Sequence, residues 1–194
     1  MMRHVMSTMG TTPLTLYATP YGRPLYEELG FKVIGRAEMV CGHFTPEAAP
    51  SAVATPGGDR RGPHPHSPAR RGGVRGRPDS PLARLPAFAD QLRVAEDNGR
   101  LIGYAAAWPN MDTHVVGPLI ARDTETAKAL VASLATHTDR PLRTDVDLRH
   151  EELLGWLKER GLAPVVMNDV MTYGIGELPG DWSRRFAPLT VAAG

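Results

Sequence analysis

The sequence has one cysteine, no long apolar segment and almost no net charge. Cys41 alone can form neither an internal disulfide nor a multi-cysteine zinc site, which suits a reducing cytoplasm. The longest apolar run, residues 101–108, is much shorter than the roughly 20 residues that span a bilayer. Residues 1–7 lack the apolar core of a secretory signal. We therefore expect a cytoplasmic protein that does not cross a membrane.

The net charge is small, and no set of cysteines and histidines has the spacing of a metal site. Lys and Arg number 22 and Asp and Glu 21, giving a formal charge of +1, so no global field attracts nucleic acid or an acidic membrane. Cys41 and His43 together with His64 and His66 match no closed zinc site in their spacing. We expect no bound metal and no specific nucleic-acid partner.

Glycine and proline are abundant, with 20 and 18 residues, and they concentrate in one region. Residues 45–82 are rich in Pro, Gly, Arg and His and show no apolar period, so burial cannot offset the entropy of ordering them. The arginines there have no interleaved aromatic residue that would stack on bases. We predict a disordered linker between residues 1–44 and a domain at residues 83–194.

The segment before the linker predicts a strand, a helix and a second strand. Leu14 to Ala18 alternate like a short strand, and Pro24 stands early in a helix that ends near Leu29. Gly30 follows where a left-handed residue would end that helix. The next strand runs from Phe31 toward position 40.

The segment after the linker begins with a hairpin. Asn98-Gly99 separates two apolar runs, and both residues accept the positive φ that a tight hairpin turn requires. Residues 114–120 form a third strand, in which Pro118 marks an edge or a bulge because proline donates no ladder hydrogen bond. Asp123 or Thr124 then caps a helix with one apolar face.

A strand at 142–147, a helix at 151–160, Gly161 as its cap and a final strand or strand pair at 163–173 complete the pattern. Residues 142–162 therefore repeat the strand, helix and glycine order of residues 14–31, which suggests two copies of one module.

The run Pro24-Leu25-Tyr26-Glu27-Glu28-Leu29-Gly30-Phe31 resembles the tyrosine, helix, Gly-Phe motif near the end of GNAT N-acetyltransferase domains. Residues 93–173 are similar to the second domain of bacterial tandem-GNAT acetyltransferases, and residues 180–187 continue the likeness. The resemblance implies an α/β (α+β) fold with a mixed, mostly antiparallel sheet flanked by helices, preceded by a partial strand-helix-strand unit from a first module.

This resemblance also implies an activity: transfer of acetyl from acetyl-CoA to an amine of a small molecule or peptide. A helix N-terminus would hold the pyrophosphate, and a splayed strand would pair with the cofactor arm. Arg122, Thr124 and Ala127 match the pyrophosphate turn, and Tyr26 matches the tyrosine that protonates the leaving thiolate.

Two departures from the family pattern leave the activity open. Glu125 replaces the central glycine of the turn, and Leu157 replaces the tyrosine in the second unit. The alternative is therefore a non-catalytic GNAT-like binding or structural module, or a truncated remnant of a tandem acetyltransferase. The composition of residues 45–82 is also what GC-rich DNA yields when read out of frame, so a frame disturbance is a further hypothesis.

The general base is not assigned by the sequence. Asp145 and Asp147 lie on one face of a strand and can act either as bases or in capping and solvation, and His114 and His150 are equally uncommitted. The apolar strand faces expected in residues 14–40 favour pairing with another surface, which includes a homodimer.

Overall fold

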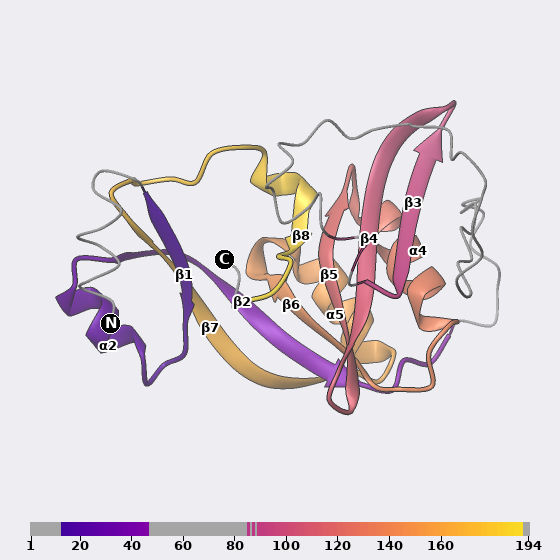
Figure 1. Ribbon diagram of the computed structural model, residues 1–194, viewed down its shortest axis with the longest axis horizontal. Helices are drawn as coiled ribbons and strands as arrows, with labels where there is room; N and C mark the ends of the chain where they lie inside the picture. Colours follow the sequence, from indigo (N-terminus) through magenta and orange to yellow (C-terminus); the bar gives the residue numbers. More distant parts are fainter. Residues whose placement is uncertain (1–12, 47–84, 86, 88, 192–194) are drawn as a thin grey trace.

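The computed structural model describes residues 13–46, 85, 87 and 89–191 (Figure 1). The strands are β1 (Leu14–Ala18), β2 (Lys32–Gly42), β3 (Gln91–Asp97), β4 (Arg100–Asn110), β5 (Thr113–Ala121), β6 (Leu142–Asp147), β7 (Ala163–Tyr173) and β8 (Arg185–Ala187). The helices are α2 (Arg23–Glu28), α4 (Thr124–Ala135) and α5 (Glu151–Glu159), with short 3-10 turns η1 (Leu148–His150) and η2 (Trp182–Arg184). Residues 47–82 of the predicted linker lie outside the described part.

The described strands form one sheet of eight, in the order β1, β7, β2, β6, β5, β4, β3, with β8 paired to β5. Every described pairing is antiparallel except that of β5 with β6. The predicted fold class, a mostly antiparallel mixed sheet flanked by helices, is confirmed. Figure 1 places β1 and α2 at one end of the molecule and β3 at the other.

The hairpin of β3 and β4 turns at Asn98 and Gly99, with φ values of 51° and 75°. Pro118 lies inside the sheet at an irregularity: Ala105 pairs with Leu119 and Ala107 with Val116, so two residues of β5 stand opposite one of β4. Of the two predicted settings for this proline, the bulge is the observed one.

The two strand-helix-strand units exchange strands. β1 of the first unit pairs with β7 of the second, and β6 of the second pairs with β2 of the first. The two registers correspond: Leu14 opposes Tyr173, just as Leu142 opposes Gly42. Adding 128 to the residue numbers of β1 gives those of β6, and adding 131 to those of β2 gives those of β7. The central pair of β2 and β7 is Ala37 with Asn168. A pseudo-twofold axis therefore passes through this pair.

Irregularities and helix ends obey the same relation. The β2–β7 register skips Ile34 on one strand and Val165 on the other, which are 131 residues apart. Gly30 and Gly161 end their helices with φ values of 90° and 96°, a left-handed conformation that favours glycine. The predicted repeat of strand, helix and glycine is therefore present, and the origin of residues 1–44 in a first module remains a prediction.

The two units are covered unequally. The main core lies between the sheet and helices α4 and α5, and it includes the fully buried residues Leu130, Leu153 and Leu157. A second, smaller cluster under α2 has only Ala18, Phe31 and Met171 as buried members. The second unit therefore packs into the larger core, which it shares with β3, β4, β5, α4 and β8.

Candidate functional site

The N-terminus of α4 is capped by its own sequence. The Asp123 carboxylate accepts hydrogen bonds from the backbone N–H of Thr126 at 2.8 Å and from its hydroxyl at 2.6 Å. These bonds lower the pKa of Asp123 below its ordinary value. A negative charge therefore already occupies the helix end at which an external phosphate would bind.

The predicted turn residues surround this cap. Arg122 donates to Asp97 at 2.8 Å and to Asp123 at 3.0 Å, on a surface where its side chain is half exposed. Thr124 is the first residue of α4, and Ala127 is fully buried. Glu125 pairs with Lys128 at 2.8 Å. Arg122, Thr124 and Ala127 therefore lie in one turn, beside the carboxylates of Asp97, Asp123 and Glu125.

A cationic pocket opens next to the turn. Arg100, Arg122 and Arg184 line an open volume of about 470 Å³, together with Asp181 and Ser183. Three arginines that line one pocket are suited to an anion, although Asp97 and Asp123 already pair with Arg122. The sequence did not indicate this pocket because its arginines come from distant segments.

Strands β5 and β6 separate soon after they meet. Their parallel pairing consists of His114 with Leu142 and Val115 with Arg143. The hydroxyl of Thr144 then donates to the carbonyl of Val116 at 3.0 Å. Beyond that point a gap separates the inner edge of β5 from β6, as it would for the splayed strand that the family resemblance implies.

The gap is filled by β8. Leu119 pairs with Ala187 and Ile120 with Arg185, and Phe186 and Ala187 are buried in the main core at 1% and 0% exposure. The backbone after β8 continues along β5, since a methyl group at Gly117 would stand 2.7 Å from the Leu189 carbonyl. In this conformation the described chain itself occupies the place where an extended cofactor arm would pair.

His150 fixes β8 in place. Its ring stacks on Phe186 with 3.8 Å between centroids, and its Nε2 lies 3.0 Å from the carbonyl oxygen of Arg185, so the neutral ring donates to that oxygen. Burial lowers the pKa of His150 and favours this neutral form. The role of His150, which the sequence left undecided, is therefore to pack against and hydrogen-bond to β8.

Around β8, aromatic and cationic side chains interleave. The Arg185 guanidinium lies 3.7 Å from the Trp182 ring centroid and donates to the Tyr17 hydroxyl of β1. The Arg149 guanidinium also lies over the Trp182 ring, 4.7 Å from its centroid. Burial raises the pKa of Tyr17. This layer connects the C-terminal segment to the first unit.

Asp145 and Asp147 lie beneath this layer with exposures of 3% and 2%. One oxygen of each, Asp145 Oδ1 and Asp147 Oδ2, has no hydrogen-bond partner among the described residues. Burial raises the pKa of Asp145. Asp147 also accepts from the Arg149 backbone at 3.0 Å. Arg149 and Trp182 of the layer above also line an open pocket of about 590 Å³.

His114 takes a structural position at the start of β5. Its Nε2 is 2.9 Å from the Asp90 carboxylate, and its Nδ1 contacts the Thr138 hydroxyl. The ring is 8% exposed. Both ring nitrogens are therefore engaged by neighbours within the fold.

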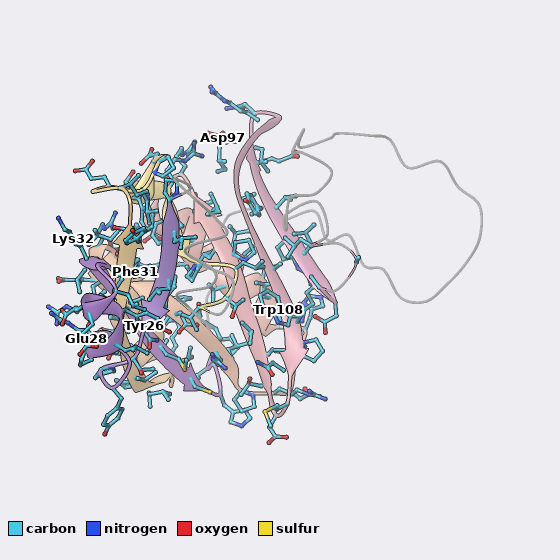
Figure 2. The ribbon with its side chains drawn as sticks, turned by 60° about the vertical axis from the view of Figure 1, so that its left-hand side comes forward. Tyr26, Glu28, Phe31, Lys32, Asp97 and Trp108 are labelled. Carbon is cyan, nitrogen blue, oxygen red and sulfur yellow. The ribbon has the colours of Figure 1, made fainter. Side chains whose placement is uncertain are left out.

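Tyr26, the predicted acid, lies apart from the α4 turn. It sits on α2 and packs edge-on against Phe31 at 5.8 Å between ring centroids. Figure 2 shows the two side by side and far from Asp97, which bonds to Arg122. Its counterpart in the second unit, Leu157, is fully buried in the main core. The structure does not bring Tyr26 together with Arg122, Thr124 and Ala127.

The described residues contain neither a group of metal-ligating side chains nor a membrane-spanning helix. No three side chains of His, Cys, Asp or Glu gather there as a metal site. None of the helices in the described ranges is long and apolar enough to cross a membrane.

Comparison with known proteins points to one family. Residues 81–187 match the family model described as the acetyltransferase (GNAT) domain. The chain is 26% identical over 159 residues to the uncharacterized N-acetyltransferase YitH of Bacillus subtilis, covering 81% of this chain and 56% of that protein. It therefore spans little more than half the length of this curated relative.

Two solved structures share the fold. A putative acetyltransferase from Pyrococcus horikoshii superposes with a TM-score of 0.65 at 16% identity, covering 93% of this chain and 59% of that one. A GCN5-related N-acetyltransferase from Anabaena variabilis gives 0.53 at 10% identity, covering 88% and 48%. At these identities the likeness concerns architecture.

Proposed function

Since the chain belongs to the GNAT acetyltransferase family, we propose that it serves N-acetyl transfer as a non-catalytic half that supports a cofactor-binding partner module. The family resemblance supports acetyl transfer in general, and GNAT acetyltransferases use acetyl-CoA as the donor. The acceptor in this proposal is an amine of a small molecule or a peptide.

One observation carries the non-catalytic assignment: β8 pairs with β5 at Leu119 and Ile120. A cofactor arm that bound by backbone pairing would need that same edge. Removing β8 would also expose Phe186 and Ala187, which are buried in the main core. Burial of a phenylalanine side chain stabilises a fold by roughly 1.5–3 kcal/mol, so displacement has a substantial cost.

The α4 turn supports the same conclusion. Its cap is satisfied by Asp123, and Glu125 adds a second carboxylate in the first helical turn. Both charges oppose a pyrophosphate, which carries negative charge of its own. The residues present therefore do not fit the pyrophosphate of acetyl-CoA at this turn.

The second candidate is direct catalysis by this chain. It is favoured by the cationic pocket of Arg100, Arg122 and Arg184 beside α4, and by the separation of β5 from β6. In that case β8 must leave the gap when the cofactor binds. The two candidates therefore differ in whether acetyl-CoA binds to this chain.

The test is calorimetric titration of the full chain with acetyl-CoA up to about 1 mM. We expect no saturable heat, and the same result for Glu125→Gly, because β8 remains in place in that variant. Asp112→Gly, which changes an acidic residue in the β4–β5 turn, controls for the loss of charge alone.

Binding by the unchanged chain would overturn the non-catalytic proposal and favour direct catalysis. Incubation with acetyl-CoA and a panel of primary amines would then show whether coenzyme A is released. The release should be followed chromatographically, because Cys41 is a free thiol that would react with thiol reagents.

A further inference from the structure

The outer edge of β1 has no strand beside it among the described residues. β1 ends the sheet order and pairs through its other edge with β7, from Leu14 opposite Tyr173 to Ala18 opposite Asp169. Its counterpart β6 is an interior strand, with β2 on one side and β5 on the other. The pseudo-twofold relation therefore shows β1 as a strand whose second neighbour is missing from the described part.

β1 also lacks the features that normally protect an edge. Its five residues, Leu-Thr-Leu-Tyr-Ala, include no charge and no proline. The opposite edge of the sheet, β3, contains Arg93, Glu96 and Asp97. Charged residues discourage pairing between molecules, whereas a short uncharged edge of high β propensity invites it.

The helix beside β1 is exposed as well. α2 has no buried residue, whereas α5 buries Leu153, Leu154 and Leu157. Leu25 of α2 is 57% exposed, and Tyr21, just before it, is 98% exposed. Exposed apolar side chains therefore lie on the helix unit next to β1, at the end of the molecule where Figure 1 shows β1 and α2.

We propose that β1 is a homodimerisation strand, which pairs antiparallel with β1 of a second copy about an axis at Leu16. In this register Leu14 lies opposite Ala18 of the second copy, and Thr15 lies opposite its Tyr17. Leu14, Leu16 and Ala18 belong to the apolar cluster beneath α2. In the dimer these three side chains and their counterparts in the second copy would form one continuous apolar row across the junction.

The charge and the symmetry of this edge both suit a second copy of the chain. The strand is uncharged and the chain has a net charge of only +1, so two copies do not repel one another. Pairing of β1 with β3 of another molecule would leave two free edges and grow without end, whereas pairing of β1 with itself closes at two copies. The chain already uses a twofold antiparallel junction at Ala37 and Asn168.

The experiment is a charge exchange at the proposed axis, read by sedimentation equilibrium of the full chain from about 1 to 200 µM. We expect the unchanged chain to dimerise. Leu16→Lys and Leu16→Glu should each raise the dimer dissociation constant by about 10-fold or more, because like charges then face each other. Mixing the two variants should restore the dimer.

The matched control is Leu92, which is 37% exposed on the opposite edge strand β3. Leu92→Lys and Leu92→Glu should leave the dissociation constant unchanged. A monomer at every concentration overturns the proposal, as does a dimer that weakens in the Leu92 variants and not in the Leu16 variants. Failure of the mixture to reassociate overturns the Leu16 axis.

Hydrogen exchange on the unchanged chain provides an independent test, should a charge at Leu16 prevent folding. Amides of residues 14–18 should exchange at least several-fold more slowly at 200 µM than at 1 µM, while those of β3 should not change. Equal exchange at both concentrations would reject the β1 junction. Neither measurement involves acetyl-CoA, so this inference and the proposed function can fail separately.

Discussion

The two strand-helix-strand units share one backbone plan and differ in what covers them. The second unit, β6–α5–β7, is enclosed by β5, β8 and α4 and contributes to a large core. The first, β1–α2–β2, has the same register and the same glycine-ended helix, yet the buried cluster under its helix has only three members. Equivalent local structure therefore does not imply equivalent stability, because the number of apolar groups packed against it decides how much it contributes.

The largest difference should appear between the buried phenylalanines of the two cores, Phe186 in the main core and Phe31 in the small cluster. Phe186→Ala empties space in the main core beside His150 and should lower the free energy of unfolding by about 4 kcal/mol. Phe31→Ala lies under α2 in the small cluster, which can collapse more easily, and should cost less. Urea denaturation followed by tryptophan fluorescence measures both. A greater loss for Phe31→Ala would contradict the unequal cores.

The next comparison uses the equivalent helix positions Leu157 and Tyr26. Leu157 is fully buried, so Leu157→Ala should cost about 3 kcal/mol. Tyr26 is only partly buried against Phe31, and Tyr26→Phe keeps its ring packing. We expect Tyr26→Phe to change stability by less than about 0.5 kcal/mol. A large effect of removing this hydroxyl would indicate a polar contact that the packing does not account for.

A smaller effect is expected at the α4 cap. Asp123→Ala should cost about 1 kcal/mol at neutral pH, while Asp123→Asn keeps an acceptor for the Thr126 N–H and should cost less. The folded pKa of Asp123 is lowered, so its contribution is present above the ordinary value of 3.8 and is lost as the pH falls through the folded pKa. Unfolding curves should therefore show a smaller stability difference between the wild-type protein and Asp123→Ala at pH 3 than at pH 7.

The smallest effect concerns pH and β8. The pKa of His150 is lowered from 6.5, so folding stability linked to it is complete above that pH and is lost as the pH falls through the folded value. Relative to the intrinsic exchange rate, which itself slows at lower pH, acidification from pH 7.5 to 5.5 should speed amide exchange in β8 and leave that in β1 unchanged. His150→Gln, which can still donate to the Arg185 carbonyl, should remove this dependence. The same acceleration in the glutamine variant would assign it to another group.

Much of the local structure could be predicted because it depends on neighbouring residues. Asn98-Gly99 makes the hairpin turn, Asp123 caps α4, and Gly30 and Gly161 end their helices. The internal repeat was equally visible, since the order of strand, helix and glycine recurs. These features follow from φ preferences and from side-chain bonds over three or four residues.

The site was less predictable because its parts come from distant segments. Spacing placed Arg122, Thr124 and Ala127 in one turn, but it could not place Tyr26 far from them on the other unit. Nor did it predict β8, since a strand of three residues has too few positions to show a period. The predicted roles of Tyr26 and of the turn remain predictions.

By itself the sequence determined the elements, their caps and the repetition of one unit, since these result from steric preferences and short-range hydrogen bonds. Only the tertiary structure decided that the two units exchange strands, that β8 enters the gap between β5 and β6, and that β1 ends the order of the described strands. Those outcomes depend on which apolar surfaces meet across more than a hundred residues. The hydrophobic effect is non-directional, so the local sequence does not specify which surfaces these are.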